Sequence, residues 1–262
     1  MSVSAAPEIL PPELYDDSEL LERAFARRQR SKFSRWFPDD GPCRRALYPK
    51  HIRFLAAGAD YRERCFVAAN RTGKSETGAF ESTAHLTGLY PHWWIGKRYD
   101  RPVQMWACGT TGKKTREVVQ AKLCGRLAPE EEMGHGDHDV GLGTGMIPGH
   151  LIVKHAMKQG TPNAIDMAWV RHVTGGLSCV TFKSYEQGRE GFDGDAVEVI
   201  WLDEECPMDI YTESLLRTMT VGGIVMVTFT PLQGLTPLVL SFMPGGTMPP
   251  MEQFAPSQEA VA

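Results

Sequence analysis

The sequence lacks the features typical of membrane, exported and zinc-binding proteins. No apolar run is long enough to span a bilayer, and the first residues do not follow the basic-then-apolar plan of a signal peptide. The six cysteines include no C-x-x-C pair, so reduced and mostly buried thiols are the better interpretation. These absences predict a soluble, intracellular protein with no membrane segment.

An excess of positive charge is also missing, because 28 Lys and Arg stand against 32 Asp and Glu, for a net charge of −4. This balance argues against a protein that binds nucleic acid over its whole surface. The charges are unevenly placed, however. Residues 23–35 are basic with no acid among them, and 129–149 are rich in glycine and acids. The basic stretch fits a contact with DNA or an acidic neighbour, or a solvated helix face. We expect a surface loop without a metal at 129–149.

Residues 65–75 are organised as an apolar strand, a Gly73-Lys74-Ser75 turn and the start of a helix. This order aims backbone N–H groups and the positive end of the helix at one point, which suits nucleotide phosphates. Lys74 would neutralise phosphate charge, and the Ser75 hydroxyl would bind Mg²⁺. Ala68 replaces the first glycine of the full motif, so this stretch alone is a weak signal.

A second stretch, 197–205, supports the first. It is an apolar strand that ends in Asp203 and Glu204. A carboxylate at the strand tip can hold the metal, and the next one can orient a water molecule. The two stretches together predict an ATPase. A similar run at 109–114 lacks the hydroxyl that would bind the metal, because Lys114 stands in its place.

The remaining pattern alternates strands and helices, which predicts an α/β fold with a parallel sheet. Thr174-Gly175-Gly176 indicates a hairpin, and a polar turn is expected at 185–194. Helices are expected at 17–30, 44–57, 75–86, 115–123 and 209–219. Strands are expected at 65–69, 102–108, 151–155, 165–173, 177–184 and 224–231, besides the acidic-ended strand in 197–205. We expect an N-terminal extension with a basic helix at 1–43, an ATPase domain at 44–240 and a flexible tail at 241–262.

Four blocks in this order resemble the ATPase domain of the large terminase subunit of tailed phages, the motor that packages DNA. They are an atypical Walker A motif at 69–75, a block at 182–189, a Walker B motif at 201–205 and a coupling motif at 228–234. The resemblance covers residues 44–237. It implies a P-loop NTPase of the ASCE type, with a mainly parallel central sheet flanked by helices and a small hairpin insertion.

The resemblance implies that ATP hydrolysis drives double-stranded viral DNA into a procapsid in the host cytoplasm, with ATP and Mg²⁺ as cofactors. The implied partners are DNA, the portal protein of the procapsid and the small terminase subunit. Further copies of the chain would form a homo-oligomeric ring on the portal, with a monomer in isolation as the other expectation. Relatives continue into a nuclease domain that is absent here, so we expect no DNA cleavage by this chain.

Roles for individual residues also follow from the resemblance. The implied catalytic residues are Glu204, Lys74 and Arg71, and the implied metal ligands are Ser75 and Asp203. The implied nucleotide-binding residues are Asn70, Arg71, Thr72, Gly73, Lys74, Ser75, Thr228 and Thr230. The two threonines would sense hydrolysis, or would be ordinary strand residues. An arginine acting on a neighbouring subunit stays open between Arg189 and Arg217.

Two other functions remain as alternatives. One is a helicase-like or repair DNA-dependent ATPase, although such proteins usually need two tandem domains and this chain has room for one. The other is a nucleotide-binding assembly module that holds ATP without hydrolysing it. The presence of Lys74, Ser75, Asp203 and Glu204 argues against that module.

Overall fold

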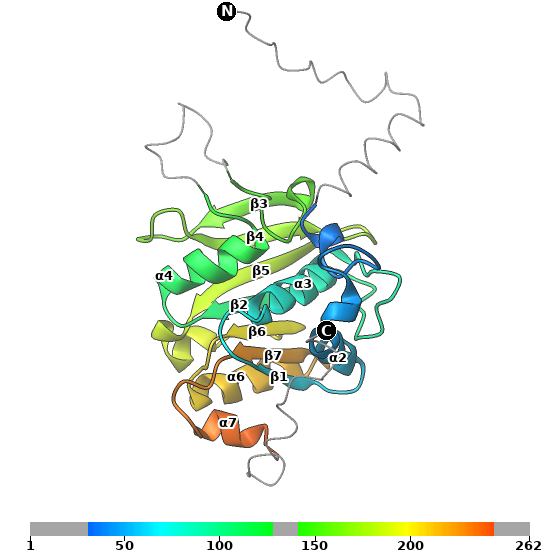
Figure 1. Ribbon diagram of the computed structural model, residues 1–262. Coiled ribbons are helices and arrows are strands. Elements are labelled where there is room, and N and C mark those ends of the chain that lie inside the picture. Colours follow the sequence, from blue (N-terminus) through cyan, green and yellow to red (C-terminus); the bar gives the residue numbers. More distant parts are fainter. Residues whose placement is uncertain (1–30, 128–140, 244–262) are drawn as a thin grey trace, which may run out of the picture.

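The computed structural model describes residues 31–127 and 141–243. Its centre is a seven-stranded sheet in the order β1-β7-β6-β2-β5-β4-β3 (Figure 1). In this spatial order the first five strands, β1, β7, β6, β2 and β5, pair in parallel. The last two, β4 and β3, complete the sheet with antiparallel pairing. The strands are β1 (Glu63–Val67), β2 (Gln104–Gly109), β3 (Ile152–Met157), β4 (Ile165–Arg171), β5 (Leu177–Ser184), β6 (Val199–Asp203) and β7 (Ile224–Phe229).

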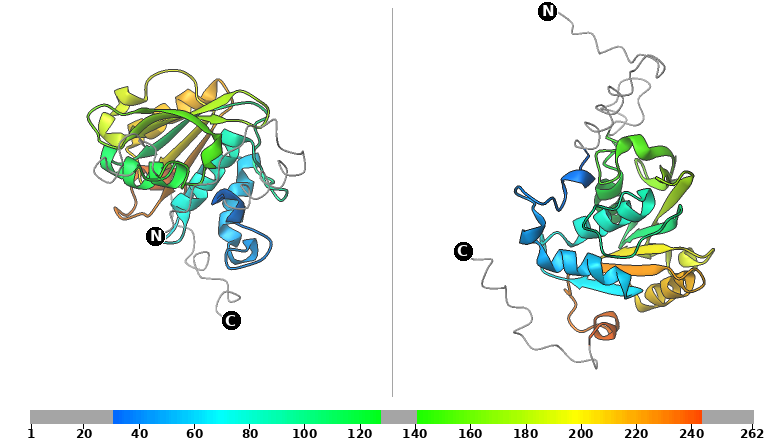
Figure 2. Two further views of the ribbon diagram at one scale, coloured as in Figure 1. Left: turned by 90° about the horizontal axis from the view of Figure 1, so that it is seen from above. Right: turned by 90° about the vertical axis from the view of Figure 1, so that its right-hand side faces the viewer.

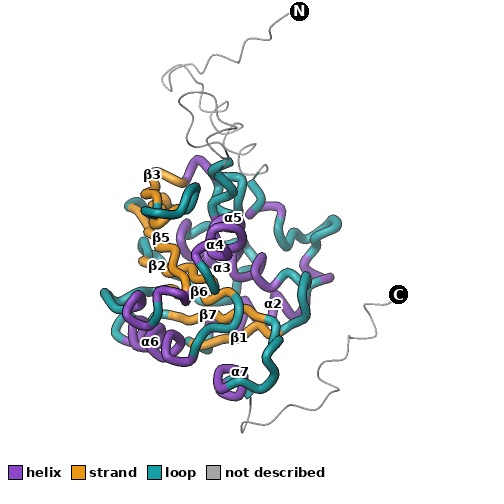
Figure 3. Tube along the Cα trace, turned by 90° about the vertical axis from the view of Figure 1, so that its left-hand side faces the viewer, coloured by secondary structure: helices purple, strands orange, loops and turns teal. Residues whose placement is uncertain are grey.

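Helices cover both faces of the sheet (Figure 2). Helices α2 (Pro49–Ala56) and α3 (Lys74–Thr87) lie on one face, and α6 (Met208–Met219) lies on the other (Figure 3). One continuous helical segment is formed by α4 (Gly112–Lys114), a π-helical stretch (Thr115–Gln120) and α5 (Ala121–Leu123). The short α7 (Pro237–Ser241) follows the last strand. Among the described residues no helix is both long and apolar enough to cross a membrane.

Strands β6 and β7 are buried along their whole length, as expected for parallel strands covered on both faces. Alternate side chains of a strand point to opposite faces. Val199 and Trp201 accordingly belong to the core on the α3 side, and Ile200 and Leu202 to the core on the α6 side. The same alternation places Asp203, at the end of β6, on the α3 side.

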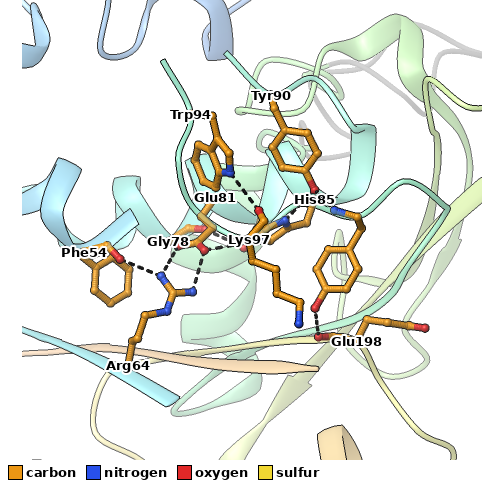
Figure 4. Close-up of polar contacts among 11 residues, drawn as sticks. Phe54, Arg64, Gly78, Glu81, His85, Tyr90, Trp94, Lys97 and Glu198 are labelled. Carbon is orange, nitrogen blue, oxygen red and sulfur yellow. Dashed lines mark hydrogen bonds and ion pairs between the residues drawn. The ribbon is translucent and has the colours of Figure 1, made fainter. Parts of the chain in front are cut away.

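A cluster of charges lies buried between β1 and the middle of α3 (Figure 4). The Arg64 guanidinium donates to both carboxylate oxygens of Glu81, at 2.7 and 3.1 Å, and to the Phe54 carbonyl at 2.8 Å. His85, one turn along α3, lies 3.3 Å from Glu81 through Nε2, and its Nδ1 bonds the Tyr90 hydroxyl. These contacts join α3 to β1 and to the chain that follows the helix.

The predicted α/β class is confirmed, and the predicted helix at 75–86 ends as expected at Gly88, which has a φ of 72°. The hairpin at 174–176 is also confirmed, but its strands extend the main sheet rather than form a separate unit. The stretch at 185–194, expected as a polar turn, is more ordered than a simple turn. That stretch forms two 3₁₀ turns, because Tyr185 and Phe192 insert into the core.

Several expectations fall outside the described residues. They are the helix at 17–30, the greater part of the basic stretch, the first part of the loop at 129–149, and nearly all of the tail. Lys32 belongs to the basic stretch and is described. Its ammonium lies 3.0 Å from the Glu76 carboxylate at the start of α3, so this member contacts the protein itself.

Candidate nucleotide-binding site

The loop between β1 and α3 has the local form that a phosphate site requires. Gly73 precedes α3 with a φ of 89°, a conformation that glycine adopts without strain, and Arg71 has a φ of 63°. The Lys74 ammonium lies at the base of this loop and donates to the Ala69 carbonyl and to Thr230 Oγ1, both at 2.8 Å. Burial lowers the pKa of Lys74, whereas the Glu204 and Asp203 carboxylates act in the opposite direction.

His51 supports this loop, although no motif in the sequence points to it. Its Nε2 lies 2.8 Å from the Thr72 carbonyl, and its ring meets Phe66 edge to face at 4.9 Å. Burial lowers the pKa of His51, so the neutral ring donates from Nε2 to the carbonyl. The contact joins α2 to the phosphate loop across 21 positions of the sequence. Local patterns do not report such a contact.

Asp203 lies at the carboxyl end of β6 and is 3% exposed. The Thr228 hydroxyl donates to its Oδ1 at 2.7 Å, and Ser75 contributes a second hydrogen bond. Burial raises the pKa of Asp203 to about 6, although both hydrogen bonds act to lower it. Asp203 has no ion-pair partner in the described part of the chain. A buried carboxylate beside a serine hydroxyl is a set of oxygen donors that suits Mg²⁺.

Glu204 has an unusual backbone conformation, with a φ of 67°. Its N–H donates to the Thr228 carbonyl at 2.8 Å, and the buried Tyr185 hydroxyl lies 3.0 and 3.2 Å from the carbonyls of Asp203 and Glu204. These bonds hold the turn after β6. Glu204 lines a cavity of about 340 Å³, whose wall also includes Lys114 and Thr230.

The two threonines of the coupling motif lie in different environments. Thr228 is fully buried, and its hydroxyl donates to Asp203, so it holds the carboxylate from the interior of the protein. Thr230 lies just beyond β7, where its hydroxyl receives the Lys74 hydrogen bond and lies 2.9 Å from Asn70 Oδ1. The structure therefore brings Lys74 and Thr230 into direct contact, next to the carboxyl ends of β1, β6 and β7.

The other predicted site residues lie at the periphery. Arg71 and Thr72 are exposed, and the Thr72 hydroxyl bonds back to the Ala69 carbonyl at 2.9 Å. Arg71 forms no ion pair within the described ranges. Arg189 and Arg217 both bind Glu213 of α6, which shows a structural use for each of them.

A protein-family comparison adds to this geometry. The family described as "Terminase large subunit, T4likevirus-type, N-terminal" matches residues 65–257, which is most of the chain. The chain belongs to this terminase family. The match includes the phosphate loop, the Asp203-Glu204 turn and both threonines of the coupling motif.

Individual large terminase subunits are similar to parts of this chain. The large subunit of Salmonella phage P22 is 39% identical over 215 residues, and that of Enterobacteria phage LP7 is 26% identical over 137 residues. The alignments cover 76% and 52% of this chain, but only 41% and 27% of those proteins. The solved ATPase domain of the Thermus phage P74-26 large terminase has a TM-score of 0.42 at 16% identity, over 66% of this chain and 61% of that domain.

Proposed function

We propose that this terminase domain binds ATP with Mg²⁺ and hydrolyses it, and that hydrolysis powers the movement of double-stranded DNA into a procapsid. One observation carries the proposal. The phosphate-loop lysine, a buried aspartate paired with a serine hydroxyl, and a second carboxylate facing a cavity all lie at one edge of a parallel sheet. This arrangement can hold a triphosphate, its metal and an attacking water.

Each residue has a role that its surroundings support. Lys74, held at the base of the loop, places positive charge where the phosphates would lie. Ser75 and Asp203 would hold Mg²⁺, which when bound offsets the negative charge of the phosphates. Glu204 borders the cavity and would orient and polarise the water. Thr230 contacts Lys74 directly, so a change at the terminal phosphate could be transmitted to the chain after β7.

Packaging requires partners that the family relationship suggests. We propose that the partners are double-stranded DNA, the portal protein, the small terminase subunit and further copies of this chain in a ring. Arg71 is exposed at the loop and is our choice for a cation acting within the same chain. A second cation would come from a neighbouring copy, which makes the rate per chain depend on assembly. Hydrolysis that rises more than linearly with protein concentration would support this part.

The decisive experiment compares two neighbouring glutamates. Glu204→Gln should reduce Mg²⁺-dependent ATP hydrolysis by roughly 100-fold or more while ADP binding is retained, because a catalytic carboxylate contributes that much in many enzymes. Glu205→Gln is the matched control: Glu205 borders the same cavity, but its carboxylate already accepts a hydrogen bond from Thr236, so its loss should affect hydrolysis little. Equal hydrolysis by wild type and Glu204→Gln would refute the catalytic role. Nucleotide binding without hydrolysis in every assembly state would favour the assembly module.

A further inference from the structure

Three side chains on β6 and β7 form a buried hydrogen-bond relay that ends at the site. The Trp201 indole Nε1–H donates to Thr228 Oγ1 at 2.8 Å, and the Thr228 hydroxyl donates to Asp203 Oδ1 at 2.7 Å. Trp201 and Thr228 are fully buried, and all three side chains face α3. The register of the strands makes this possible, because Asp203 and Thr228 are paired across β6 and β7.

The direction of the relay is determined by its first member. An indole N–H can only donate, so Thr228 Oγ1 must accept from Trp201. The one hydroxyl hydrogen of Thr228 is then free to point at Asp203 Oδ1, where a carboxylate oxygen accepts it. With the indole absent, this hydroxyl could rotate and accept or donate elsewhere. Trp201 therefore occupies the acceptor side of the Thr228 hydroxyl and leaves its hydrogen for the aspartate.

The indole ring also contacts the helix that starts at the phosphate loop. A Cβ atom added to Gly78 of α3 would lie 2.5 Å from Trp201 Nε1 and Cε2, so the ring fills the space that glycine leaves open. Gly78 is one helical turn beyond Lys74 and Ser75. The Thr228 and Trp201 side chains thus connect Asp203 to the helix that carries the other proposed metal ligand.

We propose that Trp201 is a positioning residue for Asp203, acting through the Thr228 hydroxyl to orient the carboxylate toward a metal shared with Ser75. The proposal rests on the proposed function, because it assigns a role in Mg²⁺ binding at the same site. It gives Thr228 a specific task, which is to orient the metal ligand rather than to touch the nucleotide.

The test measures the Mg²⁺ concentration that gives half-maximal binding of a fluorescent ADP analogue. Thr228→Val keeps the side-chain shape without the hydroxyl and should raise this concentration about tenfold, as losing a partner of a metal ligand typically does. Thr228→Ser restores the hydroxyl and should restore the wild-type value. Trp201→Phe should raise the concentration to a similar extent, and the Trp201→Phe, Thr228→Val double variant should be no worse than Thr228→Val alone.

Trp94→Phe is the matched control for Trp201→Phe. Trp94 is also buried, and its indole donates to the Lys97 carbonyl at 2.9 Å, away from the site. Its loss should lower stability without changing the Mg²⁺ requirement. The proposal is overturned if Trp201→Phe behaves like Trp94→Phe, or if Thr228→Val and Thr228→Ser give the same value.

A measurement without nucleotide separates this proposal from the proposed function. The indole N–H signal of Trp201, assigned by its absence in Trp201→Phe, should shift in Asp203→Ala, because the Thr228 hydroxyl loses its acceptor. An unshifted signal overturns the relay. If the wild type binds no nucleotide, the proposed function fails together with the metal-orienting role, whereas a shifted signal would still establish the relay itself.

Discussion

Helix α3 passes through two clusters of charge that differ in how the charges are satisfied. In the middle of the helix, Glu81 accepts two hydrogen bonds from Arg64 and a further contact from His85, all within the protein. At its start, the Lys74 ammonium bonds only neutral oxygens. The charges of Asp203 and Glu204 act on the pKa of this lysine, but the three form no ion pair with one another or with any other described residue.

The comparison separates charges that maintain the fold from charges that remain available to a ligand. A buried ion pair is costly to break because the remaining charge has no water to solvate it. A buried carboxylate without a cation destabilises the free protein, and a ligand that supplies positive charge can offset this unfavourable energy. Substitution of Arg64 or Glu81 should therefore act on stability, and substitution of Lys74 should act on nucleotide chemistry.

The largest effect is expected for Arg64→Met, which leaves the Glu81 carboxylate buried and unpaired. The free energy of unfolding should fall by about 3 to 5 kcal/mol. Urea denaturation of the nucleotide-free protein measures this. Adding Glu81→Leu should recover most of the loss, because both charges are then gone. If Arg64→Met is as stable as the wild type, the Arg64–Glu81 ion pair does not stabilise the fold.

Lys74→Ala should show the opposite behaviour. Hydrolysis of ATP should fall by about 100- to 1000-fold, because a preorganised positive group at the phosphates is lost. The free energy of unfolding without nucleotide should change by less than about 1 kcal/mol, since no ion pair is broken. Lys97→Ala is the control, as burial lowers the pKa of Lys97 too but its ammonium bonds Gly222, away from the site. Similar rates for the two variants would contradict the phosphate role.

Gly78→Ala tests the contact between α3 and Trp201. Gly78 lies on α3 between the two clusters. The added methyl group would overlap the Trp201 ring and should cost about 1 to 3 kcal/mol of stability. Gly112→Ala is the matched control, because a Cβ there meets nothing within 4 Å. Thermal unfolding of both variants measures the difference. Equal melting temperatures would indicate that the ring moves aside freely.

The smallest effect concerns pH and His85. Burial lowers the pKa of His85 from its ordinary 6.5, although Glu81 opposes the shift and Arg64 and Lys97 add to it. The unfolded chain therefore takes up the proton first, and stability should fall as the pH drops below about 6.5. His85→Gln should remove about 1 kcal/mol of this loss between pH 7 and 5.5. His51 and His172 have lowered pKa values too, but the wild type and His85→Gln both retain them. Identical pH profiles would show that His85 keeps its ordinary pKa.

Sequence patterns predicted those parts of the site that depend on neighbouring residues. The glycine and lysine of the phosphate loop, the aspartate at a strand tip and the threonines after the last strand are all visible as short motifs. Contacts between distant segments were not predictable. His51 reaches Thr72 from a helix, and Trp201 reads as an ordinary apolar strand residue until β6 and β7 are placed side by side. Thr228, predicted as a nucleotide-binding residue, is fully buried and donates a hydrogen bond to Asp203, a contact that the motif does not report.

The backbone of Glu204 has a consequence for attempts to engineer this domain. Its φ of 67° lies in a region that costs a non-glycine residue on the order of 1 kcal/mol. A directed-evolution screen that rewards only heat resistance or expression would therefore favour Glu204→Gly. Libraries built on this scaffold should retain selection for ATP turnover, because Glu204→Gly would remove the carboxylate that we propose orients the attacking water.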